Sequence, residues 1–207
     1  MAQPSLRELT RPDVTALVIQ EVQNGVIGPG ATLRALADAA AEVGVIPNTA
    51  RLAAAAREAG ITVIHTTAEN LPGGFGGNSN ARLFAGARKQ GAAIAPGTAS
   101  VKPVDEVHAA DDLVLPRYHG LSPMTGTQLD SLLRNNGVTT VVVAGVSLNV
   151  AIPNLVFDAV NRSYQVVVAS DAVAGIPAEY GRQVIDNCLR LLATVVSTDD
   201  LVAAWKR

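Results

Sequence analysis

Apolar runs alternate with helical patterns along the chain. Short runs rich in β-branched residues predict six buried strands, and their nearly continuous apolar character is typical of parallel strands that are covered on both faces. This alternation predicts an α/β fold of three layers, α-β-α, in which a doubly wound parallel sheet of about six strands lies between helices. The predicted strands are Thr15–Ile19, Ile61–His65, Asp112–Pro116, Thr139–Val146, Tyr164–Ser170 and, as a sixth candidate, Ala193–Ser197.

Helices are predicted between these runs. From Pro47 to Gly60 apolar residues recur at helical spacing, and Gly60 provides a C-terminal stop. Pro153, near the start of the third predicted helix, suggests that this helix begins slightly late. The last predicted helix carries the single cysteine, Cys188, among leucines, which favours a buried core thiol. The other predicted helices are Thr127–Asn136, Ala151–Arg162 and Ala178–Leu192.

One segment, Glu69–Ser100, departs from the alternation. It is rich in Gly, Asn and Ala and contains the sequence PGGFGGNSNAR, Pro72–Arg82. Long connections of this kind are often functional loops, so we expect a lid that carries Phe75. The glycines of Gly73–Gly77 lack the lysine of a phosphate-binding loop and do not open a helix directly after a strand. No linker or repeat interrupts the chain, so we expect one domain over residues 1–207.

Composition excludes several classes of protein. The chain is 48% hydrophobic and 16% charged, which is typical of a globular protein, and its net charge is −2. Without a basic run, a nucleic-acid partner is not expected. No apolar stretch reaches the roughly 18 residues that span a bilayer, and the start, MAQPSLRELTRPD, lacks the apolar core of a signal peptide. A single cysteine excludes an internal disulfide. We therefore expect a cytoplasmic protein that binds neither nucleic acid nor membrane.

Polar side chains follow three of the predicted strands. The first strand ends at Gln20 and Glu21, another is followed by Arg117 and His119, and a third by Ser147. Ligands of open parallel sheets bind beyond the carboxyl ends of the strands. If the first two of these strands are neighbours, Glu21 and Arg117 meet in one crevice. A nearby arginine would keep Glu21 ionised and burial would favour the neutral acid, and the sequence leaves both open.

Each of these residues also has a structural interpretation. Glu21 and Arg117 could form an ion pair without a chemical role, and His119 could be an exposed loop residue. His65, at the end of a strand, is more typical of a hydrogen-bonded core histidine. Ser147 is not surrounded by the G-x-S-x-G sequence of a serine nucleophile. No His, Cys or Asp cluster has the spacing of metal ligands, so neither a metal nor another cofactor is expected.

Four stretches carry a resemblance to a known family. They are TALVIQEVQNGVIG from Thr15, RLAAAAREAGITVIHT from Arg51, LPRYHGLSPMTGTQLDSLLRNNGVTTVVVAGV from Leu115, and GVSLNVAIPNLVFDAVNRSYQVVVASDAVAG from Gly145. From about Asp13 to Trp205 the chain resembles the isochorismatase-like (cysteine hydrolase) superfamily. The resemblance implies that Glu21 stands at the family's catalytic Asp, Arg117 at its Lys and Ala151 at its nucleophilic Cys. All three catalytic residues are therefore replaced.

These replacements decide which chemistry the resemblance allows. The methyl group of Ala151 cannot attack a carbonyl, so the thioester route is closed and the nicotinamidase, N-carbamoylsarcosine amidase and ureidoacrylate amidase activities are disfavoured. The resemblance also includes a branch without the cysteine, in which the first-strand carboxylate acts alone as an acid. Glu21 could act in that way. Arg117 either binds a substrate carboxylate with its planar fork or clamps Glu21 and weakens it as an acid.

The expected function follows from these assignments. We expect a Cys-independent hydrolase or lyase that acts on a small, carboxylated substrate, with Glu21 as the acid or base. The alternatives are a catalytically silent member that binds a metabolite or a partner protein, and an unrelated nucleotide-binding α/β protein. The resemblance further implies a cis peptide bond between Val146 and Ser147, and a homodimer or homotetramer. The residues expected to contact the substrate are Asn24, Phe75, His119, Val146, Ser147 and Asn149.

Overall fold

A single parallel sheet organises the chain. The computed structural model describes residues 4–89 and 94–206, and its six strands lie in the order β3-β2-β1-β4-β5-β6. The strands are β1 Thr15–Gln20, β2 Thr62–Ala68, β3 Leu113–Arg117, β4 Thr140–Val146, β5 Gln165–Ala174 and β6 Thr194–Val196. The helices are α1 Leu6–Leu9, α2 Arg34–Val43, α3 Val45–Ala59, α4 Arg82–Lys89, α5 Leu129–Asn135, α6 Ala151–Asn161, α7 Ala178–Asn187 and α8 Thr198–Trp205.

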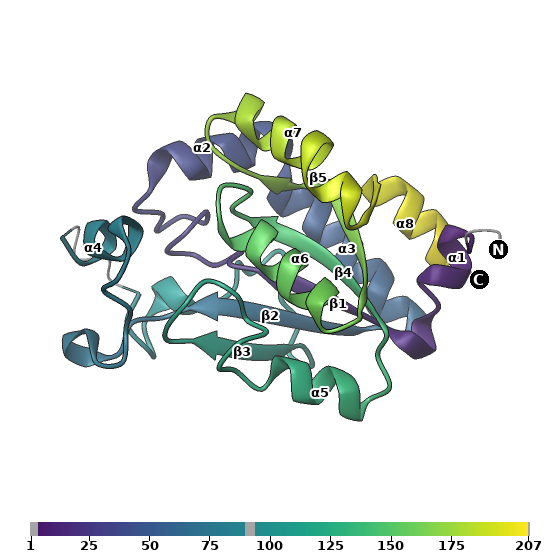
Figure 1. Cartoon of the computed structure of the whole chain (residues 1–207), viewed down its shortest axis with the longest axis horizontal. Helices are drawn as coiled ribbons and strands as arrows, with labels where there is room; N and C mark the ends of the chain where they lie inside the picture. The colour runs from purple at the N-terminus through teal and green to yellow at the C-terminus, as the bar shows by residue number, and fades with distance from the viewer. Residues whose placement is uncertain (1–3, 90–93, 207) are drawn as a thin grey trace.

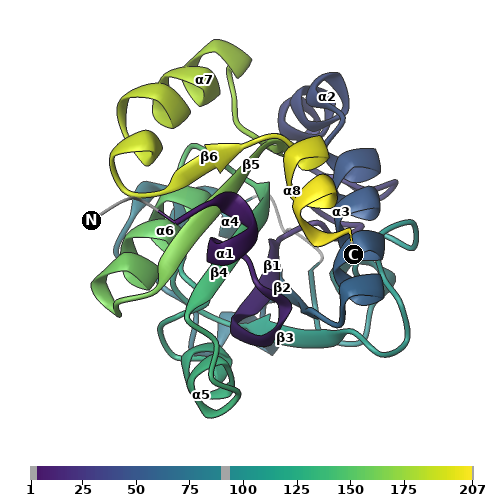
Figure 2. The ribbon, with the colours of Figure 1, turned by 90° about the vertical axis from the view of Figure 1, so that its right-hand side faces the viewer.

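Helices cover both faces of the sheet (Figure 1). Successive strand residues point to opposite faces, so Leu17 of β1 joins the apolar core beneath α2, α3 and α8, whereas Val18 joins the core beneath α5, α6 and α7. Figure 2 shows α3 and α8 on one side of the sheet and α6 on the other. The predicted α/β fold with a doubly wound sheet is confirmed. Among the described residues, no helix is both long enough and apolar enough to cross a membrane.

The predicted strands are confirmed in position, and β5 differs most in length. It continues past Ser170, its predicted end, to Ala174. The reason lies in its pairing with β4, in which Val143 pairs with Val168 but Gly145 pairs with Val173. Such an irregularity leaves residues unpaired on one strand and lets the strand bend and pair again.

Two predictions about helix ends are wrong. Helix α6 begins at Ala151 rather than late, because Pro153 occupies the first turn, where a missing N–H costs no intrahelical hydrogen bond. Helix α7 ends at Asn187, short of the predicted Leu192. Cys188 therefore caps this helix and is only partly buried at the edge of the core, not within it.

Four helices were not predicted, namely α1, α2, α4 and α8. Helix α8 begins with a capping box, in which Ser197 Oγ accepts from Asp200 N at 3.2 Å and Ser197 N donates to the Asp200 carboxylate at 3.0 Å. Helix α2 ends at Val43 with Gly44 as its C-cap, and α3 follows at Val45, ahead of the predicted start. Helix α4 lies within the segment 69–100, which was expected to be a loop.

The strand order fixes where a ligand site can form. The chain passes from β1 outward to β2 and β3 on one side, and later places β4, β5 and β6 on the other side of β1. The reversal of strand order between β1 and β4 is the position at which open α/β sheets bind ligands, beyond the carboxyl ends of the strands. Glu21 follows β1 and Ser147 follows β4 at this position.

Candidate active site

The side chains of Glu21 and Arg117 meet beyond the carboxyl ends of the strands. Arg117 Nη2 donates to Glu21 Oε1, and the two side chains are only 7% and 15% exposed. The sequence predicted this meeting only if their strands were neighbours, but β2 lies between β1 and β3. Strands are spaced about 4.8 Å apart, and the long arginine side chain spans the additional strand.

The backbone of Glu21 turns the chain sharply out of β1. Glu21 has φ = 54°, a left-handed conformation that is uncommon for a residue other than glycine. Its N–H still donates to the carbonyl of Thr66 at 2.9 Å. Neighbouring Gly145 has φ = 113°, and a Cβ there would lie 2.0 Å from the carbonyl oxygen of Gln20. Unusual backbone of this kind concentrates at functional sites, where it aims a side chain.

Most of the donors of Arg117 are used by the protein itself. Besides Glu21, its guanidinium donates through Nη1 to the carbonyl of Gly120 and, at 3.4 Å, to that of His119. Its Nε–H is buried, and no acceptor for it is found among the described residues. A two-pronged clamp needs two free N–H groups on one edge of the fork, and Nε–H and one N–H of Nη2 have no acceptor among the described residues. The use of Arg117 as a clamp for a substrate carboxylate therefore stays a prediction.

Two residues that were not predicted as site residues complete the surroundings of Glu21. Gln20 is fully buried, and its Nε2 donates to Glu21 Oε1 at 3.0 Å and to the carbonyl of Leu121 at 3.4 Å. Gln20 Oε1 accepts from Thr66 Oγ1 at 2.6 Å. Both donors to Glu21, from Gln20 and Arg117, thus reach Oε1, and none of the described residues donates to Oε2. The sequence signal that could have identified Gln20 as a site residue is its amide, which directly follows the apolar residues of β1.

Ala151 is the first residue of α6, close to the carboxyl end of β4. It is 4% exposed and offers only a methyl group. The peptide bond between Val146 and Ser147 is cis, as the resemblance implied. The Ser147 carbonyl accepts from the N–H groups of Val150 and Ile152 at 3.2 and 3.0 Å. No side chain caps the start of this helix.

Two of the predicted substrate contacts hold the backbone of the protein. Asn24 Nδ2 donates to the carbonyl of Ala99 at 3.2 Å. Asn149 accepts from the N–H of Ile176 at 2.8 Å and donates to the carbonyl of the same residue. Both amides therefore fix loops around the site, Asn24 through its Nδ2 and Asn149 through both of its polar atoms.

Two further predicted contacts, His119 and Phe75, are exposed. The ring of His119 lies over Gly126, where a Cβ would come within 2.2 Å of His119 Cε1. Phe75 is 79% exposed on the segment 72–82. This segment is tied to the turn after β3, because Asn78 Oδ1 accepts from the N–H of Gly120 at 2.7 Å. The structure thus places the Phe75 segment beside the turn that holds Arg117.

On the α3 side of β2, His65 belongs to a buried structural cluster, as its core interpretation predicted. His65 Nε2 lies 2.9 Å from Asp112 Oδ2, and Arg57 Nε and Nη2 donate to the same carboxylate at 2.9 and 2.6 Å. Burial raises the pKa of Asp112, but hydrogen bonds from Arg57, the Ala109 N–H and His65 outweigh it and lower the pKa to about 2. Burial lowers the pKa of His65, against the opposing effect of Asp112. This cluster joins α3, β2 and the start of β3.

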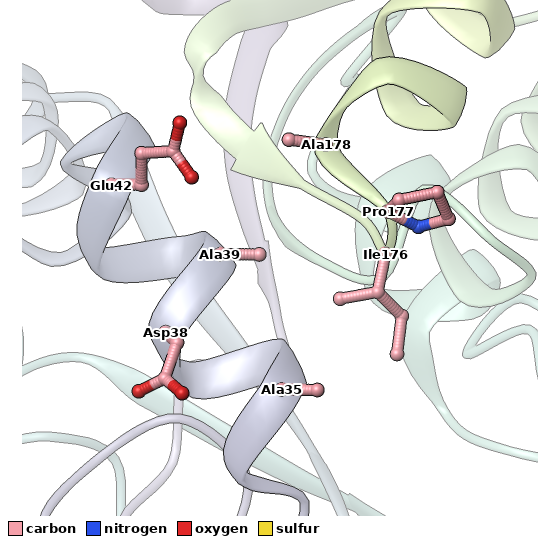
Figure 3. Close-up of a pocket in the computed structure, with 7 residues that line it drawn as sticks. All are labelled: Ala35, Asp38, Ala39, Glu42, Ile176, Pro177 and Ala178. Carbon is pink, nitrogen blue, oxygen red and sulfur yellow. The ribbon is translucent and has the colours of Figure 1, made fainter.

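Two surface clefts lie apart from the Glu21–Arg117 pair. One, of about 530 Å³, separates α2 from the segment before α7 (Figure 3). Ala35 and Ala39 of α2 face Ile176 across it, and Asp38 points away. The other, of about 440 Å³, lies between His108 and Val114. Neither cleft is lined by Glu21, Arg117 or Ala151. Among the residues that the structure describes, no group of three or more His, Cys, Asp or Glu side chains could hold a metal ion.

Comparison with known protein families shows to which family this chain belongs. Residues 15–200 match the model of the isochorismatase domain. The chain belongs to the isochorismatase family. A ureidoacrylate amidohydrolase of Methylorubrum extorquens (strain AM1) is 35% identical over 183 residues, which cover 80% of this chain and 73% of the relative. A probable inactive nicotinamidase of Arabidopsis thaliana is 32% identical, with 80% and 83% covered.

Solved structures agree with this family assignment. An isochorismatase-family protein of Desulfovibrio vulgaris superposes with a TM-score of 0.79 at 28% identity and covers 94% of this chain and all of its own. A cysteine hydrolase of Pseudomonas syringae pv. phaseolicola superposes with a TM-score of 0.82 at 23% identity and covers 99% of this chain and 98% of its own. At that lower identity the second comparison supports the fold alone.

Proposed function

We propose that this isochorismatase-family protein is a Cys-independent hydrolase or lyase, in which Glu21 serves as the acid or base on a small, carboxylated substrate. The observation that carries the proposal is the asymmetry of the Glu21 carboxylate. Oε1 is held by Arg117 and Gln20, and Oε2 is left without a donor among the described residues. A catalytic carboxylate needs this combination of a fixed orientation and one oxygen that is free to exchange a proton.

Glu21, Arg117 and Ala151 are proposed to stand where the family carries its Asp, Lys and Cys. Because Ala151 has no nucleophile, water is the attacking group in a hydrolysis. In this hydrolysis Glu21 acts as a general base through its free oxygen. Its Oε2 takes a proton from water as the water oxygen bonds to the electrophilic carbon of the substrate, and the same proton then passes to the leaving group. Arg117 stays protonated throughout and holds Oε1.

An anionic substrate is supported by the start of α6. The first N–H groups of a helix have no intrahelical acceptor, and the positive end of the helix dipole favours a negative group. Here Ala151 begins α6 without a side-chain cap. Several relatives are named ureidoacrylate amidohydrolases, and their printed substrate carries a carboxylate. We propose that the substrate carboxylate lies near Ala151 and that the Phe75 segment closes over it.

We also propose that the protein works in the cytoplasm as a homodimer or homotetramer. The edge strand β3 exposes Leu113 and Val114 at 41% and 39%, and exposed apolar edge strands are commonly covered. Sedimentation at micromolar concentration tests the assembly, and a monomer would remove this part of the proposal.

A second candidate, a catalytically silent binding protein, has specific observations in its favour. The guanidinium of Arg117 is largely engaged by the protein, and Ala151 is almost fully buried. One relative is named a probable inactive nicotinamidase. In this alternative the Glu21–Arg117 pair only stabilises the fold.

A screen of small carboxylated vinyl ethers, amides and esters separates the two candidates. The proposal predicts turnover by the wild type that falls by about 100-fold or more in Glu21→Gln, which keeps the size of the side chain and removes the base. Glu58→Gln, on the exposed face of α3, is the matched control and should retain full turnover. The absence of turnover from the wild type, or equal turnover by Glu21→Gln, would leave the silent protein as the function.

A further inference from the structure

We propose that Gln20, oriented by Thr66, is a positioning residue that determines which oxygen of Glu21 faces the substrate. The inference rests on the proposed function, since it assigns a role in the same site. Gln20 is the last residue of β1, and its amide lies between the hydroxyl of Thr66 on β2 and the carboxylate of Glu21. Neither Gln20 nor Thr66 has to touch a substrate in this role.

Only one orientation of the Gln20 amide satisfies its neighbours. With Nε2 toward Glu21, the amide donates to the carboxylate at 3.0 Å and to the Leu121 carbonyl at 3.4 Å. Rotating the amide by 180° would direct its carbonyl at two acceptors, which repel it. Thr66 Oγ1 lies 3.3 Å from the Ile19 carbonyl and donates at the shorter distance of 2.6 Å to Gln20 Oε1, which supports the productive orientation. The hydroxyl of Thr66 thus acts on Glu21 through Gln20.

The burial of Gln20 argues that the amide serves the site rather than the fold. All six residues of β1 are buried, and those from Ala16 to Ile19 are apolar. Burying an amide at such a position costs free energy that its hydrogen bonds offset at best, whereas a leucine would gain from burial. A residue that is poor for stability and aimed at Glu21 is typical of a side chain retained for function.

The consequence for Glu21 is a fixed choice between its two oxygens. Arg117 and Gln20 approach Oε1 from the β3 side and from β1, so rotation of the carboxylate would break two hydrogen bonds at once. Without Gln20, only Arg117 remains, and either oxygen can pair with it after rotation. The loss of positioning should therefore slow turnover and leave substrate affinity almost unchanged, because misplacement of a reacting group affects the reaction step.

Four variants test whether Thr66 positions Glu21 through Gln20: Gln20→Leu, Thr66→Val, their double variant and Thr66→Ser. On the substrate found in the screen, Gln20→Leu and Thr66→Val should each lower kcat by about 10- to 100-fold, with KM changed less than about threefold. Because Thr66 acts through Gln20, the double variant should be no slower than Gln20→Leu alone. Thr66→Ser keeps the hydroxyl and should restore most of the lost turnover. Thr62→Val, the same change at an exposed position of β2, is the matched control.

Thermal unfolding supplies the readout that separates positioning from structural support. Gln20→Leu should unfold at the wild-type temperature or above it. A lower unfolding temperature together with proportionate loss of kcat, or additive effects in the double variant, would overturn the proposal. If the wild type turns over no substrate, the proposed function fails. Crystal structures of the variants then test whether Thr66 orients the Gln20 amide. In that case an unchanged Gln20–Glu21 hydrogen bond in Thr66→Val would overturn it, and a displaced Gln20 amide would support it.

Discussion

Replacing Asp112 with Asn should destabilise the protein through the buried cluster beneath β3. The Asp112 carboxylate accepts from Arg57, His65 and the N–H of Ala109. An asparagine offers one acceptor oxygen where these donors converge, and its own NH₂ group would face them. Removing one partner of a buried ion pair costs roughly 3–5 kcal/mol, because the remaining charge is left unpaired.

The lowered pKa of Asp112 gives a second value for the contribution of this carboxylate to stability. Its fall from 3.8 to about 2 corresponds, at about 1.4 kcal/mol for each pKa unit, to roughly 2 kcal/mol of stability at neutral pH. Because the pKa is lowered in the folded state, this stability is fully present above about pH 4 and is lost as the pH falls toward 2. Asp112→Asn lacks this contribution at every pH, so its difference from the wild type should narrow in the same range.

Urea unfolding at pH 7, 4 and 3 measures both effects. The expected loss in Asp112→Asn at pH 7 is about 2–5 kcal/mol, with a clearly smaller loss at pH 3. Asp199→Asn is the matched control, because Asp199 pairs with Arg51 at the surface and should contribute less than about 1 kcal/mol. A loss below about 0.5 kcal/mol, or a difference between the two proteins that does not change with pH, would refute the reasoning.

Three further predictions test other parts of the structure. Gly145→Ala should lower the unfolding temperature far more than Gly137→Ala, because a Cβ at Gly145 would lie 2.0 Å from a carbonyl oxygen and Gly137 has open space, and similar losses would contradict this. Since burial lowers the pKa of His65, the unfolded state binds a proton first as the pH falls below 6.5, so urea unfolding should show wild-type stability falling there by at most about 1.4 kcal/mol per pH unit. His65→Gln should show a shallower slope, and an identical slope would contradict the assignment. Phe75→Ala should leave the free energy of unfolding within about 0.5 kcal/mol of the wild type and slow turnover, and undiminished turnover would contradict the proposed lid.

The parts of the fold with strong local signals were predictable from the sequence. The apolar strands were located correctly because every residue of a strand such as β4 is buried, which imposes a continuous apolar run. Helix α8 also had a readable signal, the Ser197–Asp200 capping box, although it was not used. The length of β5 had no such signal, since it depends on a register shift against β4.

The site was predictable as a set of strand ends but not as a network. The carboxylate of Glu21 and the guanidinium of Arg117 were expected to meet only if their strands were neighbours, yet they pair across β2, which depends on side-chain reach and not on strand order. The engagement of Arg117 by the carbonyls of a nearby turn involves backbone atoms, which every residue carries. The amide of Asn149 was equally ambiguous, because its partner, Ile176, is distant in sequence.

The most direct test of the proposed function compares initial rates of hydrolysis by the wild type, Glu21→Gln and Cys188→Ser on the best carboxylated substrate. Cys188→Ser should keep the wild-type rate, because Cys188 caps α7 through its backbone N–H and is not among the residues around Glu21. Glu21→Gln should lose about 100-fold or more. A wild-type rate in Glu21→Gln, or a comparable loss in Cys188→Ser, would contradict a site that works through the carboxylate and without a thiol.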